Sequence, residues 1–263
     1  MTRAKRHYIP GQIWHITHRC HKRDFLLKFA KDRKRWLQWL YEAKKRYGLV
    51  ILNYAVTSNH IHLIVVGGED RDVIPDSIKL IAGRTGQEFN QRKNRKGAFW
   101  EDRYHATAIE SGEHLFKCLV YIDLNMVRAG VVDYPSEWPF CGYNEIQEPK
   151  RKKILINYER LTRLLGFDSY DEVKKYHRRW VDGYLGDGKN IRDEKWTKSI
   201  AVGNRSFVER IKSIMGVLAI GRKSIEVGES YQLREPSIPY GARFGAKKCD
   251  IGPENTYFWD VIL

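Results

Sequence analysis

Two histidines separated by one residue are the sharpest chemical feature of the sequence. His60 and His62 lie in the apolar run at 59–66, whose composition predicts a β-strand. Alternate residues of a strand point to the same side, so the two imidazoles share one face while the intervening aliphatic side chains pack on the other. Two imidazoles this close can bind one divalent metal ion. The spacing alone also fits two surface histidines that make ordinary hydrogen bonds.

A tyrosine and an asparagine four residues apart form the second feature. Tyr121 and Asn125 lie in the segment 121–130, which we expect to be helical. Residues four positions apart lie on the same face of a helix. An activated, aligned phenol can attack a phosphodiester and form a covalent intermediate. An amide oxygen can complete the coordination of a hard metal ion. By itself, the pair also fits a tyrosine packed on the core and an asparagine in a helix-terminal turn.

An aromatic and charged segment at 99–105 is the third feature. Trp100 and Arg103 could bind single-stranded DNA, the indole by stacking on a base and the guanidinium by contacting a phosphate. The alternative is a strand with a buried tryptophan and a salt bridge.

The chain carries a large excess of positive charge. Its 47 Lys and Arg residues outnumber 32 Asp and Glu residues, giving a net charge of +15. Such an excess favours a polyanionic partner, because each neutralised phosphate releases counterions. The sequence shows no strongly basic helix with a clean apolar face, so an anionic membrane surface is a less favoured partner than nucleic acid. The residues that we expect to contact DNA are Arg19, Arg92, Lys93, Arg95, Lys96, Trp100 and Arg103.

The cysteine spacing and the hydropathy exclude several classes of protein. The four cysteines are far apart and form no Cys-x-x-Cys pair, which argues against a zinc ribbon and a disulfide framework. We expect reduced, mostly buried thiols at Cys20, Cys118, Cys141 and Cys249. No apolar run approaches the roughly 18 to 20 residues that span a bilayer. No apolar signal core follows the basic start, so we expect a cytoplasmic protein without a membrane partner.

The elements that must position these residues follow from periodicity and turn signals. In chain order we expect a strand at 12–17, a helix at 32–47, strands at 49–56 and 61–66, a helix from 75, a strand or hairpin arm at 98–109, and a helix between 111 and 130. This order predicts an α+β fold of ferredoxin-like type, with a central antiparallel sheet flanked by helices. Asp32 and Ser111 are expected to cap helix N-termini, and Gly48 and Gly130 to end helices.

A second region is expected after a transition rich in proline and basic residues. We place the catalytic domain at 1–148 and a smaller, mainly helical accessory region, a further candidate for DNA binding, at 149–263. Helices are expected near 170–184 and at 206–216, the latter with a capping box formed by Ser206 and Glu209. The last ~40 residues show no regular pattern.

Four segments in their order along the chain resemble the single-tyrosine HUH transposases of the IS200-like family, and most closely the branch associated with repetitive extragenic palindromes (REP). These segments are residues 14–19, 58–63, 100–104 and 121–130, within a resemblance that spans roughly residues 6–145. The sequence departs from the common family pattern at Ser58 and Met126, where proline is frequent, and at Glu101, where glutamine is frequent. Glu101 adds negative charge, which puts a base contact at that position in doubt.

The resemblance implies a ferredoxin-like catalytic domain and a specific reaction. It assigns His60 and His62 as metal ligands, Asn125 as the third ligand and Tyr121 as the nucleophile, with Mg²⁺ or Mn²⁺ as the metal. Tyr121 would cut single-stranded DNA beside a foldback hairpin, forming a 5′-phosphotyrosine and a free 3′-hydroxyl that can later reseal or exchange strands without ATP. The metal would act as a Lewis acid and orient the phosphate. Such an enzyme would work at the bacterial nucleoid.

Two other functions remain open at this point. One is a domesticated regulator that binds hairpin DNA without cleaving it, and the other is a metal phosphodiesterase that hydrolyses DNA without a covalent step. A monomer and a homodimer with shared active sites are both compatible with the sequence. The transposase interpretation makes a geometric demand: the helical segment with Tyr121 and Asn125 must bring both side chains to the strand face that bears His60 and His62.

Overall fold

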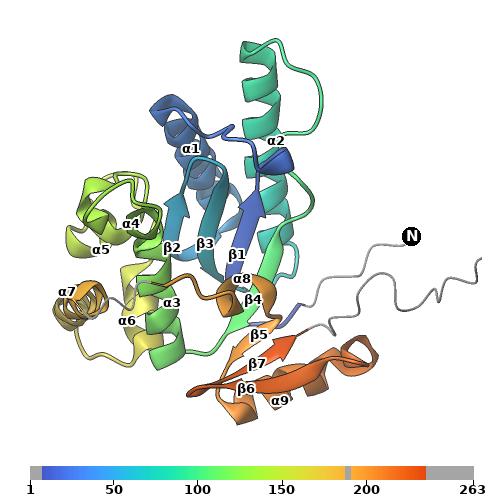
Figure 1. Cartoon of the computed structure of the whole chain (residues 1–263), viewed down its shortest axis with the longest axis vertical. Coiled ribbons are helices and arrows are strands. Elements are labelled where there is room, and N and C mark those ends of the chain that lie inside the picture. Colours follow the sequence, from blue (N-terminus) through green and yellow to red (C-terminus); the bar gives the residue numbers. More distant parts are fainter. Residues whose placement is uncertain (1–7, 187–190, 235–263) are drawn as a thin grey trace, which may run out of the picture.

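The computed structural model describes residues 8–186 and 191–234 (Figure 1). Its first half contains, in chain order, β1 (Ile13–Arg19), α1 (Ala30–Tyr47), β2 (Val50–Val56), β3 (His60–Val66), α2 (Val73–Arg92), β4 (His105–Ile109) and α3 (Glu113–Asp123). These strands pair antiparallel in the order β2-β3-β1-β4. The predicted α+β fold with a central antiparallel sheet is confirmed. No helix within the described ranges is long and apolar enough to cross a membrane.

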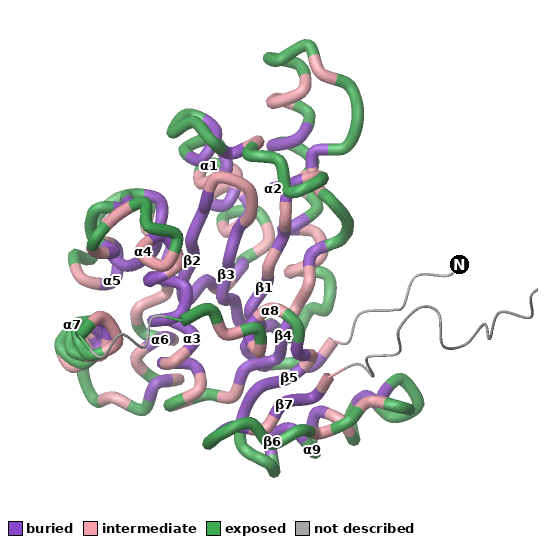
Figure 2. The backbone as a smooth tube through the Cα atoms, viewed as in Figure 1, coloured by how far each residue is buried: buried purple, intermediate pink, exposed green. Residues whose placement is uncertain are grey.

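The register of β1 and β3 places the two histidines beside a basic residue. Arg19 pairs with His60, and Thr17 pairs with His62. Alternate positions of β3 pack into the core at Ile61, Leu63 and Val65, which are at most 1% exposed. The buried positions run along the central strands (Figure 2), so the sheet provides a rigid base for the site.

The first helix begins differently from the expectation. Its N-cap is Phe29, and no side chain caps it, so the predicted cap at Asp32 is wrong. Asp32 is instead buried in the first turn, where it forms an ion pair with Arg92 at the end of α2. A long-range ionic partner therefore takes the carboxylate away from the helix end. Gly48 ends α1 with a left-handed backbone, at φ 68°, as predicted.

The helix with Tyr121 is divided in two. Gly112, with φ 70°, precedes α3, and no side chain caps it, so the predicted cap at Ser111 is wrong. The helix ends at Asp123, and a second short helix, α4 (Asn125–Arg128), follows before Gly130. The expected single helix through 130 is therefore interrupted one residue before Asn125.

The segment before β4 is not a strand. Only an isolated bridge between Trp100 and Cys20 forms there, so the predicted strand at 98–109 is wrong in its first seven residues. The backbone of this segment bonds to the loop after β1 instead: the Phe99 carbonyl accepts from the His21 amide, and the Glu101 amide donates to the Arg19 carbonyl.

The C-terminal region is helical in part, as expected, and it also extends the sheet. The further elements are η1 (His21–Arg23), η2 (Pro135–Glu137), α5 (Tyr143–Gln147), α6 (Tyr158–Leu165), α7 (Tyr170–Gly186), α8 (Lys195–Lys198), β5 (Ala201–Gly203), α9 (Arg205–Met215), η3 (Gly216–Ala219), β6 (Lys223–Val227) and β7 (Ser230–Arg234). The helices expected at 170–184 and 206–216 are present as α7 and α9. Strand β5 pairs parallel to β4 and gives a seven-stranded order of β2-β3-β1-β4-β5-β7-β6 (Figure 1).

The N-cap of α9 is Asn204, whose side chain accepts a hydrogen bond of 2.8 Å from the Phe207 amide. The predicted capping box is therefore wrong. Ser206 donates to the Asn204 side chain, and Glu209 accepts from Ser224 of β6. The helix starts one residue earlier than expected, which moves both predicted capping residues inside it.

The described cysteines agree with the expectation of reduced thiols. Cys20, Cys118 and Cys141 are free and buried. Cys249 lies outside the described residues.

Candidate active site

The four residues singled out in the sequence converge on one face of the sheet. The rings of His60 and His62 lie 4.9 Å apart, and the ring of Tyr121 lies 6.1 Å from that of His62. The Asn125 amide is 3.0 Å from Nε2 of His62. His62 is 1% exposed and His60 is partly buried, so the two histidines are not a pair of exposed surface residues. The break between α3 and α4 does not prevent Tyr121 and Asn125 from reaching the same place.

The loop before β3 fixes the orientation of His60. Its Nδ1 lies 2.7 Å from Oδ1 of Asn59 and 2.9 Å from the hydroxyl of Thr57, whose own hydrogen goes to the His60 carbonyl at 2.8 Å. Both neighbours of Nδ1 therefore accept, so the imidazole hydrogen is on Nδ1. The lone pair of Nε2 is left for another partner.

A second histidine holds His62. Nδ1 of His62 lies 2.9 Å from Nε2 of His15, and Nδ1 of His15 lies 2.8 Å from the carbonyl of Trp196. The two rings are stacked, with centroids 5.1 Å apart. His15 is fully buried, and this desolvation lowers its pKa to about 3, so the ring is neutral.

Three arginines from distant parts of the chain give the site a positive field. The pKa of His60 is lowered to about 4, first by burial and then by the charges of Arg19, Arg192 and Arg128. These residues come from β1, from the segment before α8 and from α4. A positive field beside two neutral imidazoles suits a phosphate group, because the guanidinium charges are fixed at physiological pH.

Tyr121 lies between a cation and an indole. The Arg128 guanidinium is 4.2 Å from the phenol ring centroid, and the Trp196 ring is 6.1 Å away. Burial raises the pKa of Tyr121, while the charges of Arg128 and Arg192 oppose this rise. The phenol is therefore protonated at rest, and the two cations favour the phenolate once it forms.

The metal-binding potential of the site rests on imidazole and amide donors. Within the part of the chain that the structure describes, no group of three or more His, Cys, Asp or Glu side chains could hold a metal ion. His60 and His62 each direct their Nδ1 hydrogen to a protein acceptor, so the Nε2 atom of each ring carries the lone pair that could bind a metal ion. This arrangement is the usual one around metal-binding histidines. Asn125 adds an amide whose oxygen is a ligand for hard cations.

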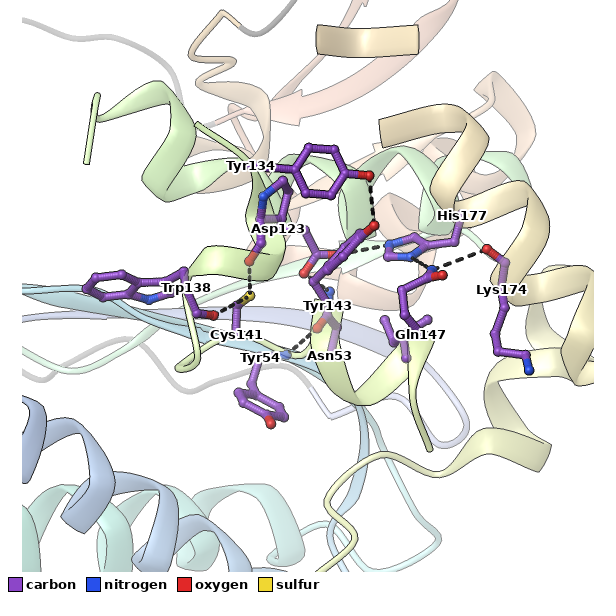
Figure 3. A network of polar contacts seen from close by, with 12 residues as sticks. Asn53, Tyr54, Asp123, Tyr134, Trp138, Cys141, Tyr143, Gln147, Lys174 and His177 are labelled. Carbon is purple, nitrogen blue, oxygen red and sulfur yellow. Dashed lines mark hydrogen bonds and ion pairs between the residues drawn. The ribbon is translucent and has the colours of Figure 1, made fainter. Parts of the chain in front are cut away.

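A buried polar network fixes the turn between Tyr121 and Asn125 (Figure 3). The Asp123 carboxylate accepts from Nδ2 of Asn53 at 3.1 Å and from Nε2 of His177 at 2.8 Å. Gln147 donates to the other nitrogen of His177 at 3.0 Å. Strand β2 and helices α5 and α7 thereby hold the residue between the two site residues.

The comparisons with known proteins agree with this geometry. The family described as Transposase IS200 like matches residues 9–125. The match covers less than half of the chain, so it shows what residues 9–125 are similar to. The matched range begins before β1 and ends at Asn125, so it contains all four converging residues.

Two solved structures are similar to the chain. One is a REP-associated tyrosine transposase bound to a REP hairpin, which is 24% identical with a TM-score of 0.47, over 55% of this chain and 84% of that one. The other is a candidate transposase from Deinococcus radiodurans R1, which is 17% identical with a TM-score of 0.33, over 45% of this chain and 92% of that one. No curated protein matches the chain.

The residues that we expect to contact DNA lie in different surroundings. Arg19 lies at the site beside His60, and Lys93, Lys96 and Arg103 are exposed, with the Lys93 ammonium over the Phe29 ring. The other three contact the rest of the protein as follows. Arg92 pairs with Asp32, Arg95 bonds to Asn90 and the Ala98 carbonyl, and Trp100 donates to the Ala82 carbonyl and stacks on His18.

Four residues of the site were missed in the sequence. His15 carried a usable signal, because it shares a strand face with Arg19. Arg128 stands in the same motif as Tyr121. Arg192 and Trp196 lie beyond the matched residues 9–125 and carry no sequence signal, since only folding brings them to the tyrosine.

Proposed function

We propose that this protein is a metal-dependent transposase that nicks and rejoins single-stranded DNA through a phosphotyrosine at Tyr121. The observation that carries the proposal is the convergence of Tyr121 and Asn125 on the imidazoles of His60 and His62. A structural role for the tyrosine alone would not need two neutral imidazoles beside it, one of which accepts a hydrogen bond at Nε2 from Nδ2 of Asn125.

His60, His62 and Asn125 would hold the metal, through two Nε2 atoms and one amide oxygen. The amide oxygen suits a hard cation, and the family resemblance suggests Mg²⁺ or Mn²⁺, so we propose one of these two ions. When bound, the metal would supply Lewis-acid polarisation of the scissile phosphate.

The chain's own residues perform the transfer. The Tyr121 oxygen attacks the scissile phosphorus and loses its proton to water, while the bond from phosphorus to the 3′ oxygen breaks and this oxygen takes a proton from water. The products are a 5′-phosphotyrosine and a DNA end with a 3′-hydroxyl. Arg128 lies over the phenol ring and favours the phenolate. Attack by a 3′-hydroxyl on the phosphotyrosine reverses the chemistry and releases Tyr121.

We propose single-stranded DNA next to a hairpin or palindromic repeat as the substrate. The net charge of +15 and the three arginines at the site support a nucleic-acid partner. The hairpin is the part of the substrate that the family resemblance suggests, and the REP-associated transposase described above is itself bound to one. A homodimer stays a prediction.

The test is a search for covalent adducts. The protein is incubated with Mn²⁺ and labelled oligonucleotides that carry imperfect palindromes and single-stranded flanks, and the products are separated on denaturing gels. The intact protein should give an adduct stable to SDS, and Tyr121→Phe should give none while hairpin binding is retained. Tyr41→Phe, on the outer part of α1, is the matched control and should form the adduct normally.

The alternatives give different results in the same assay. Binding without cleavage would identify a hairpin-binding regulator. Cleavage without an adduct would identify a phosphodiesterase. An adduct that persists in Tyr121→Phe would show that another residue is the nucleophile.

A further inference from the structure

The segment around α8 contacts the strands of the site through its backbone. The Trp196 carbonyl accepts from His15 at 2.8 Å and from the Thr107 hydroxyl at 3.3 Å. The Ser199 carbonyl accepts from Thr107 at 2.7 Å and bonds to Nε2 of His105 at 3.0 Å. This segment lies about 70 residues beyond Asn125, where the match to the transposase family model ends, and its sequence indicates no chemistry.

Two hydrogen bonds connect the Trp196 carbonyl to His15 and His15 to His62. If both rings are neutral, only one placement of their hydrogens satisfies both bonds. A carbonyl can only accept, so the hydrogen of His15 is on Nδ1, and its Nε2 must accept. Nδ1 of His62 faces that acceptor and therefore carries the hydrogen of His62. The Nε2 atom of His62 is left with its lone pair, which accepts a hydrogen bond of 3.0 Å from Nδ2 of Asn125.

We propose that His15 is a positioning residue that sets the tautomer of His62, and that the Trp196 carbonyl completes the metal site by setting the tautomer of His15. The proposal rests on the proposed function in that His62 is taken as a metal ligand. It gives the C-terminal region a specific task at the site: without the Trp196 carbonyl, His15 could donate from Nε2, and His62 would then place its hydrogen on the atom needed by the metal.

Burial makes the relay effective. His15 is 0% exposed and His62 is 1% exposed, so water does not offer alternative partners to their ring nitrogens. An unmatched buried donor or acceptor costs about 1–3 kcal/mol, which disfavours the opposite tautomers. Two stacked aromatic residues without polar atoms would fill the same space, so packing alone does not account for a histidine at position 15.

The first test reads the tautomers directly. The full-length protein, labelled with ¹⁵N in its histidine rings and free of metal, is studied by NMR for the nitrogen that carries the hydrogen. His15 and His62 should both be in the Nδ1–H form. A hydrogen on Nε2 of His62 would overturn the proposal, whether or not the protein binds a metal.

The second test measures Mn²⁺ affinity by calorimetry and by the loss of the free-ion EPR signal. His15→Phe should weaken binding by about 10–100-fold, the usual loss when a partner of a metal ligand is removed. His15→Gln keeps one donor and one acceptor and should restore part of the affinity. Thr107→Val removes two hydrogen bonds to the same segment without touching His62, and it should bind Mn²⁺ like the unaltered protein.

The outcomes separate the two proposals. If the unaltered protein binds no Mn²⁺, the proposed function fails, and the tautomers still decide the relay. If it binds Mn²⁺ and His15→Phe binds equally well, the relay is wrong. Equal losses in His15→Phe and Thr107→Val would assign the effect to docking of the segment, which also contradicts the relay. Should both His15 variants fail to fold, the NMR result on the unaltered protein stands alone.

Discussion

The histidines of the site are held neutral by their surroundings. Burial lowers the pKa of His15 to about 3, and burial with three nearby arginines lowers that of His60 to about 4. An unfolded histidine titrates near 6.5. Both residues are therefore uncharged at physiological pH and can act as hydrogen-bond acceptors or ligands without first losing a proton.

This neutrality predicts a loss of stability in mild acid. Between pH 6.5 and about 4 the unfolded chain binds protons at these positions and the folded chain does not, so the free energy of unfolding falls as the pH falls through this window. Each group that stays neutral contributes about 1.4 kcal/mol per pH unit. Thermal unfolding of the metal-free protein should shift to lower temperature from pH 6.5 to 4.5, and His15→Phe should reduce the slope. An unchanged slope in that variant would show that His15 is not protected from protons.

The site was predictable at the residue scale where the chemistry is local. The faces of His60 and His62 follow from strand periodicity, and their meeting with Tyr121 and Asn125 is observed. Their catalytic roles remain proposals. The hydrogen-bond partner of His62 could not be predicted in the same way. The sequence does not show which ring nitrogen of a histidine in a strand will form a hydrogen bond, or with which residue.

At the scale of elements, the junction of α1 and α2 changes the expected DNA contacts. Arg92 ends α2 and forms an ion pair with Asp32, which is 4% exposed, whereas Lys93 and Lys96 are exposed in the loop that follows. In the same basic segment, Arg92 and Arg95 bond to the rest of the protein, whereas the ammonium groups of Lys93 and Lys96 form no ion pair within the described residues.

Substitutions in this segment should separate stability from DNA binding. Lys93→Ala with Lys96→Ala should leave unfolding unchanged, weaken single-stranded DNA binding for all sequences, and lower the slope of log affinity against log salt by about 0.7 for each phosphate that is no longer neutralised. Arg92→Ala leaves a buried carboxylate unpaired and should cost about 1–3 kcal/mol of stability. Urea unfolding and binding titrations at several salt concentrations measure both effects. If Arg92→Ala changes only the salt slope, its ion pair with Asp32 is not structural.

The elements themselves were predictable where they are long and periodic. Strands β2 and β3 and helices α1, α2 and α7 match their expected positions closely. The cap at Asp32 was wrong because its carboxylate pairs with Arg92, which is distant in sequence. The cap at Ser206 was wrong because Asn204, two residues earlier, takes that role. Strand β5 was missed because three residues are too few for a pattern, and its pairing with β4 is a tertiary choice.

For the whole molecule, the sheet joins the part of the chain that matches the transposase family model to the C-terminal region. Strand β5 pairs with β4 through Ala108 and Ile109, and the Trp196 side chain beside Tyr121 is 2% exposed. The division at 148, which remains a prediction from sequence, therefore cuts a chain whose two parts share one sheet and one site.

A fragment of residues 1–148 should have both a less stable sheet and a less ordered site. It uncovers the β4 edge and removes the acceptor for His15, so we expect lower solubility, a broader unfolding transition and weaker Mn²⁺ binding than in the full chain. Gel filtration, circular dichroism and calorimetry on both proteins test this expectation. A fragment that unfolds cooperatively and binds Mn²⁺ as the full chain does would confine the site to the first 148 residues.

The contact from Trp196 to His15 also bears on when the protein becomes active. A ribosome makes Tyr121 well before it makes Trp196, so a growing chain carries the proposed nucleophile before the acceptor that orders His15 and His62. On the proposed relay, polypeptides that stop between these two points would hold this tyrosine beside an unordered metal site. Only chains that extend past Trp196 would then have a complete site.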